Sequence, residues 1–61
     1  MIAFVAPSKD AVHRAYEAAL ANGGTDEGAP GPRPADSTSF YGCYLRDPTG
    51  NKICIYAKGP F

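Results

Sequence analysis

The chain has 61 residues, six of them basic and six acidic, and therefore carries no net charge. The charges form no basic cluster, which argues against nucleic acid and against an anionic membrane as partners. No apolar run approaches the roughly 20 residues that cross a bilayer. Two cysteines, Cys43 and Cys54, are too few for the disulfide framework of a small secreted domain. Free thiols without an export signal indicate a cytoplasmic protein.

Length sets a second limit. A chain this short buries only about 60% of the surface that its unfolded form exposes, so its core is marginal. Residues 1–61 can form one small domain, which normally needs a disulfide, a metal or a partner for support. The lone His13 and the two cysteines form no zinc motif. We therefore expect association with another chain.

The first half of the sequence predicts a strand followed by a helix. Ile2–Ala6 is a short β-prone run that ends at a proline. Ser8 stands where a helix N-cap is expected, and Lys9–Asn22 has helical composition. One apolar stripe with helical spacing runs through this segment, at Val12, Ala15, Tyr16, Ala19 and Leu20. The pair Gly23-Gly24 predicts the helix end.

The second half predicts an irregular segment and then a hairpin. Thr25–Asp36 is rich in Gly and Pro, so we expect a loop with at most a short edge strand, because Pro cannot serve in a central strand. Ser37–Arg46 and Lys52–Ala57 are β-prone, and Asp47–Gly50 between them is a turn sequence. The order strand, helix, edge strand, hairpin predicts an α+β fold with one helix and a mixed or antiparallel sheet.

The register of the hairpin decides which residues share a face of the sheet. A three-residue loop, Pro48–Gly50, sets Tyr44 opposite Cys54, whereas a four-residue loop sets Cys43 opposite Cys54 and mixes the two faces. We favour the first register because it separates aliphatic from aromatic side chains. It leaves one face apolar and beyond the reach of the single helix, with Ala3, Val5, Phe40, Tyr44, Cys54 and Tyr56. Because this face is so apolar, we expect a second copy or a ligand to cover it.

Four segments in this order resemble a known family. They are Ile2–Phe4 before the Ser-capped helix, Gly23–Pro34, Phe40–Gly42 and Arg46–Ile53. Together they cover nearly the whole chain and resemble the C-terminal module of glyoxalase-like proteins in the vicinal oxygen chelate superfamily (glyoxalase/bleomycin resistance protein/dioxygenase). The resemblance implies a single βαβββ module that pairs with a second module to form a curved sheet around a cavity. It also implies, for metal-dependent members, a divalent ion that polarises vicinal oxygens of the substrate.

The positions that supply metal ligands in such relatives hold other residues here. Where the family often has His before the first strand this chain has Met1, and where a Glu is common in the last strand it has Cys54. A thiolate is a soft ligand, poorly suited to the harder metal sites of this family. A lone cysteine facing a cavity is more often a small buried hydrophobe. We therefore expect no metal, no cofactor and no catalytic residue from this chain.

Other candidate residues favour structural roles. His13 follows core-facing Val12 on the helix, so we expect it in solvent and not as a base in a cavity. Arg33, flanked by prolines, could bind a carboxylate or phosphate, or could close the sheet edge, and we favour the second role slightly. The four aromatic residues Phe40, Tyr41, Tyr44 and Tyr56 are expected to serve packing and dimer contacts more than substrate binding. The acidic residues Asp26, Glu27, Asp36 and Asp47 are expected in turns and on the surface.

Three functions remain open from the sequence. The first is a metal-free module, or an enzyme remnant, that binds a small apolar or aromatic molecule as a homodimer or a higher even oligomer. The second is a glyoxalase-like lyase or dioxygenase whose missing ligands come from another chain or from a lost N-terminal half. The third is a structural subunit that completes another chain's cavity. The sequence does not decide whether Met1 is the natural start.

Overall fold

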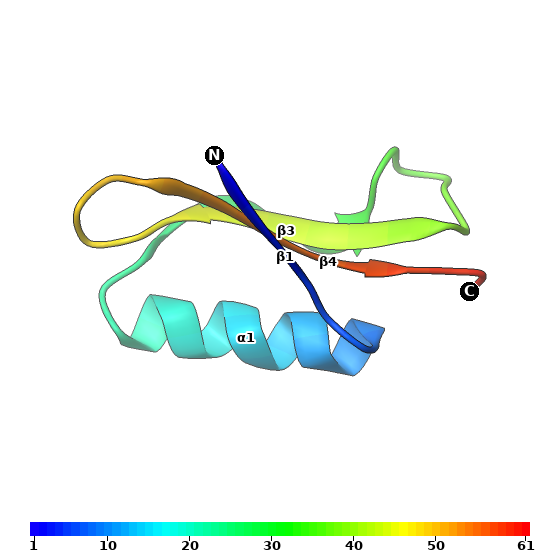
Figure 1. Cartoon of the computed structure of the whole chain (residues 1–61), viewed down its shortest axis with the longest axis horizontal. Coiled ribbons are helices and arrows are strands. Elements are labelled where there is room, and N and C mark those ends of the chain that lie inside the picture. Colours follow the sequence, from blue (N-terminus) through cyan, green and yellow to red (C-terminus); the bar gives the residue numbers. More distant parts are fainter.

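The computed structural model describes residues 1–61 and has the α+β architecture expected from the sequence. Its elements follow in the order β1 (Ile2–Val5), α1 (Lys9–Ala21), β2 (Thr25–Pro32), β3 (Phe40–Arg46) and β4 (Lys52–Lys58). The four strands form one mixed sheet in the order β1-β4-β3-β2, in which β1 is parallel to β4 and the other pairs are antiparallel. The helix lies against one face of this sheet (Figure 1).

The helix begins and ends at the residues that its caps select. The Ser8 hydroxyl accepts a hydrogen bond from the Ala11 amide at 3.1 Å, which satisfies one of the free N–H groups of the first turn. Asn22 is the C-cap, one residue earlier than the predicted end of the helix, and Gly23 follows with a φ of +95°. At 13 residues, α1 is too short and too polar to cross a membrane.

The Gly- and Pro-rich segment is more regular than predicted. Where the sequence predicted a loop with at most a short edge strand, Thr25–Pro32 forms an eight-residue strand at the edge of the sheet. Its pairing with β3 is interrupted by register shifts on both sides of Gly28. Prolines are tolerated here because an edge strand pairs on one side only and an N–H is not needed at every position.

The hairpin has the register favoured from the sequence. Tyr44 pairs with Cys54, and Asp47 accepts from Asn51 across a turn whose last residue, Gly50, has a φ of +92°. The Asp47 carboxylate also accepts from Thr49. These hydrogen bonds, those from Asn51 first, lower the pKa of Asp47 below its usual value. Asp47 is thus the turn residue that the sequence predicted.

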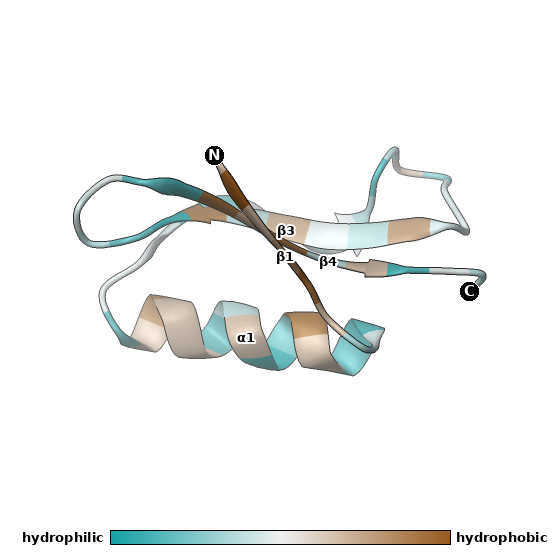
Figure 2. Cartoon of the chain, in the orientation of Figure 1, coloured by the Kyte–Doolittle hydropathy of each residue, from teal (hydrophilic) through white to brown (hydrophobic).

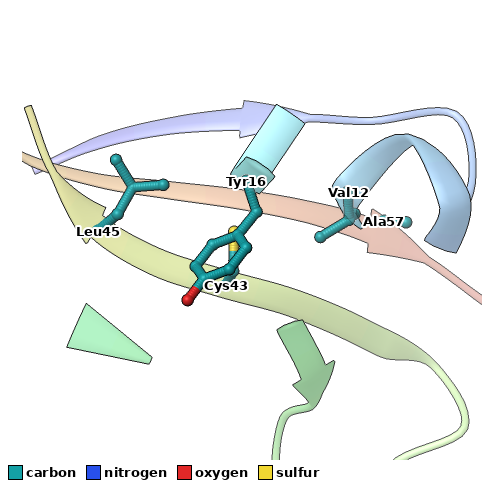
Figure 3. Close-up of a cluster of buried hydrophobic side chains, with 5 residues drawn as sticks. All are labelled: Val12, Tyr16, Cys43, Leu45 and Ala57. Atoms are coloured by element: carbon teal, nitrogen blue, oxygen red, sulfur yellow. The ribbon is translucent and has the colours of Figure 1, made fainter. Parts of the chain in front are cut away.

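The core lies between α1 and the covered face of the sheet. Its buried side chains are Val12, Tyr16, Cys43, Leu45 and Ala57, drawn in Figure 3, where Tyr16 reaches from α1 towards Cys43 on β3. The Tyr16 hydroxyl donates to Asp26 at 2.9 Å and so ties the helix to β2. Only 7 of the 61 residues are buried, which leaves a single module with little hydrophobic stabilisation.

Candidate functional site

The sheet face opposite α1, here called the open face, gathers the residues predicted to line a cavity. Ala3 pairs with Cys54, which pairs with Tyr44, so the three share one side of the sheet. Val5 pairs with Tyr56 in the same way. Alternation along β3 adds Phe40 to this side. Six strand positions and the register thus agree with the sequence prediction, and Arg33 reaches the face from beyond the end of β2.

The centre of the open face is a buried thiol. Cys54 is only 4% exposed although no helix covers it. Burial raises the pKa of the Cys54 thiol, and a hydrogen bond from Tyr44 and the charge of Arg33 offset this only in part. Cys54 is therefore protonated at neutral pH and behaves as a small apolar residue.

Aromatic rings cover the rest of the open face in two groups. Phe40 and Tyr56 stack with ring centroids 4.9 Å apart and planes 15° from parallel. Two cations lie over Tyr44, the Arg33 guanidinium 5.5 Å and the Lys52 ammonium 5.6 Å from its ring centroid. The sequence analysis missed Lys52, although its position two residues before Cys54 on β4 places it on the same face.

The Arg33 side chain lies over β2 at Gly28, where the absence of a side chain leaves room for the guanidinium. Its Nη2 atom donates to the Ala29 carbonyl oxygen at 2.6 Å. A Cβ atom on Gly28 would lie 3.0 Å from the same nitrogen, so a side chain there would displace the guanidinium. The Nε atom of Arg33 is buried and has no hydrogen-bond partner in the chain. The Arg33 guanidinium thus lies against the β2 edge strand and still has a donor without an acceptor.

The helix side of the molecule holds a second polar cluster away from the open face. His13 is exposed, as expected, and its Nε2 atom lies 2.5 Å from the Tyr41 hydroxyl. The Lys9 ammonium lies over the rings of Tyr41 and Phe61. A hollow of about 430 Å³ adjoins this cluster, lined by Pro7, Ser8, Lys9, Asp10, Lys58, Pro60 and Phe61. The open face itself has no hollow, so it can enclose a molecule only together with a second surface.

The residues of this chain do not fit the divalent ion that the family resemblance implies. Met1 and Cys54 hold the positions where the family resemblance places metal ligands, and they offer a thioether and a protonated thiol where a hard ion needs oxygen or imidazole. No three His, Cys, Asp or Glu side chains gather in a group that could hold a metal. Asp26 and Asp47 accept hydrogen bonds within the chain, and Glu27 pairs with Arg46 at 3.3 Å.

The free edge of the sheet is apolar on both sides. All four residues of β1 are exposed, although its sequence is Ile-Ala-Phe-Val. Ile2 and Phe4 point to the helix side, where they remain 50% and 53% exposed, and Val5 on the open face is 66% exposed. The hydrophobic colour runs along the whole of β1 in Figure 2. A strand that is apolar on both faces is typical of the interior of a sheet. The composition of β1 is therefore that of an interior strand, although β1 lies at the sheet edge.

Comparison with known proteins agrees with this architecture. Residues 1–55 match the family described as Glyoxalase/Bleomycin resistance protein/Dioxygenase superfamily. The solved structure of a glyoxalase/bleomycin resistance protein from Albidiferax ferrireducens T118 superposes with a TM-score of 0.81 at 41% sequence identity. The match covers 95% of this chain and 46% of that protein, so this chain spans about half the length of its relative. No curated protein matches the sequence.

Proposed function

This chain belongs to the glyoxalase/bleomycin resistance protein/dioxygenase superfamily, and we propose that it acts as a metal-free binding module. Two copies pair through their β1 edges and hold a small apolar or aromatic molecule between their open faces. The observation that carries the proposal is β1, a strand at the sheet edge whose side chains are apolar on both faces and exposed. Pairing there would cover Ile2, Phe4 and Val5 together, at about 25 cal/mol per Å² of apolar surface removed from water.

The small core supports the same proposal. A module with so few buried side chains gains stability from every apolar residue that a second copy covers. The open face supports the choice of ligand, because stacked Phe40 and Tyr56 offer a flat apolar surface for a ring. The chemistry of Met1 and Cys54 supports binding without a metal.

Pairing is tested by sedimentation of the purified chain over a range of concentrations. We expect a dimer or a higher even oligomer, and Val5→Lys should shift it to monomer because a charge on the paired edge would have to be desolvated. Thr49→Lys, at the exposed hairpin tip, is the matched control and should leave the oligomer intact. A wild-type chain that sediments as a monomer at all concentrations would contradict the pairing.

Metal-free binding is tested by calorimetric titration with naphthyl-methanol, a neutral flat probe. We expect binding that is equal in EDTA and in buffer with added Mn²⁺, Ni²⁺ or Zn²⁺. Tyr56→Ala should abolish it, whereas Tyr41→Phe on the covered face should not. Binding that appears only with an added metal would overturn the proposal in favour of a lyase or dioxygenase whose ligands come from a second chain.

A further inference from the structure

Charge on the open face has one sign. Alternation along β3 and β4 places Arg46, Lys52 and Lys58 on this side of the sheet, and Arg33 joins them over Tyr44. One carboxylate balances this set, that of Glu27, which forms the only ion pair of the chain with Arg46. The net charge of the whole chain is zero, so the excess of basic residues on the open face is balanced by acidic residues elsewhere.

Four other acidic residues lie away from this face. Asp26 accepts from the Tyr16 hydroxyl on the helix side, and Asp47 accepts the amides of its turn. Asp10 and Glu17 lie on α1, on the opposite side of the sheet. Arg33 and Lys52 consequently have no carboxylate within the chain, and each instead lies over the ring of Tyr44.

Arg33 shows the clearest deficit of acceptors. Its guanidinium is fixed by the Ala29 carbonyl oxygen and by the Tyr44 ring, so it is oriented before any ligand arrives. Its buried Nε atom has no acceptor. A guanidinium that is held in place and forms no ion pair within the chain is suited to the paired oxygens of a carboxylate.

The cationic and aromatic groups are arranged in sequence along one strand. Lys52, Cys54 and Tyr56 are successive open-face positions of β4, so at about 3.3 Å per residue Tyr56 lies about 13 Å from Lys52 and about 7 Å from Cys54, whose partner Tyr44 lies beneath both cations. Buried Cys54 lies between them and offers no charge. This spacing fits a molecule with a flat apolar body and an anionic group at one end.

We propose that the open face selects planar aromatic anions, with the ring on Phe40 and Tyr56 and the carboxylate between Arg33 and Lys52. The inference rests on the proposed function, since it names the ligand class of the same binding module. It excludes cationic ligands, because the face would repel them and has no free carboxylate to receive them.

Three probes of one shape separate charge from apolar contact. Naphthalene-carboxylate, naphthyl-methanol and naphthyl-methylammonium are titrated into the purified chain at low and at high salt. We expect the carboxylate to bind about tenfold more tightly than the alcohol at low salt and the ammonium to bind more weakly than both. The advantage of the carboxylate should shrink at high salt, while the affinity for the alcohol should not fall.

Variants then locate the charge effect. Arg33→Gln and Lys52→Gln should each lower the affinity for the carboxylate more than the affinity for the alcohol, and so reduce the preference between them. Lys9→Gln removes a cation that lies over Tyr41 and Phe61 on the other side of the molecule, so it is the matched control and should change neither. Circular dichroism verifies that each variant is folded, and Lys52→Gln carries the test if Arg33→Gln is not.

The outcomes separate the two proposals. Equal affinity for all three probes, or a preference for the ammonium, would overturn the anion selectivity and leave the binding module standing. A preference for the carboxylate that survives in both glutamine variants would overturn the assignment to Arg33 and Lys52. No binding of any probe would overturn the proposed function itself, and the anion selectivity with it.

Discussion

The two faces of the sheet are made from the same strands but differ in how deeply their side chains are buried. On the covered face, Cys43 and Leu45 are fully buried beneath Val12 and Tyr16 of α1. On the open face, aromatic and cationic side chains stay partly exposed around Cys54. One helix has enough apolar surface for one face only. The open face therefore has no covering element within the single module.

The two edges of the sheet differ in the same sense. The β2 edge contains Pro30 and Pro32 and two register shifts, features that prevent another strand from adding to it. The β1 edge contains none of these features and is apolar on both faces. The molecule is thus protected against strand pairing on one edge and open to it on the other, which agrees with the proposed pairing through β1.

The largest expected effect comes from creating a cavity in the core beneath α1. Leu45→Ala removes a side chain that is 1% exposed, and we expect it to lower the free energy of unfolding by about 2–5 kcal/mol. Urea denaturation at fixed protein concentration measures the loss. Leu45→Ile keeps the volume and should cost less than about 1.5 kcal/mol. Equal costs for the two variants would contradict a closed core at this position.

A smaller effect is expected from crowding the open face. A Cβ atom on Gly42 would lie 2.9 Å from the Ile55 carbonyl oxygen and 3.0 Å from the Cβ atom of Tyr56. We expect Gly42→Ala to cost about 1–3 kcal/mol in urea denaturation and to weaken probe binding, since Tyr56 must move. Gly31→Ala on the neighbouring strand meets only the Ala29 carbonyl oxygen, at 3.9 Å, and should change neither measurement.

The reactivities of the two thiols allow the faces to be compared directly, because Cys43 lies on the covered face and Cys54 on the open face. Burial raises the pKa of Cys43 and of Cys54, so both are protonated at neutral pH. We expect iodoacetamide to modify each at neutral pH at a rate on the order of tenfold or more below that in the unfolded chain. Cys54 should react before Cys43, because side chains alone cover it whereas α1 must detach to expose Cys43. Mass spectrometry of timed samples gives both rates, and the reverse order would contradict the comparison.

The smallest effect is expected at the start of the helix. Ser8→Ala removes the hydroxyl that accepts the Ala11 amide and should cost about 1 kcal/mol of unfolding free energy, measured in urea. Ser8→Asp can accept the same hydrogen bond and should restore most of the loss. Naphthyl-methanol affinity should stay unchanged in both variants, because the cap lies on the side of α1 and not on the open face. A weakened affinity in Ser8→Ala would mean that the two faces are coupled.

Local patterns predicted most of the fold. Ser8 and the Gly23-Gly24 pair fixed the helix to within one residue, and the sequence Asp47–Gly50 fixed the turn. The position of the turn predicted that Tyr44 pairs with Cys54, and this register predicted which residues lie on the open face. Such predictions succeed because caps, turns and alternation depend on neighbours in the chain. The edge strand Thr25–Pro32 is longer than the short edge strand that the sequence predicted, because its pairing depends on β3 and not on its own residues.

What the sequence by itself determined is the order of the elements, the register of the hairpin and the composition of the open face. Only the tertiary structure decided how far that face is covered and how its charges are arranged. It placed Arg33 and Lys52 on the same ring, left the Arg33 Nε atom without an acceptor and held Asp26 on the far side. The physical reason is that burial and charge balance are set by side chains distant in sequence, whereas register is set by the turn between adjacent strands.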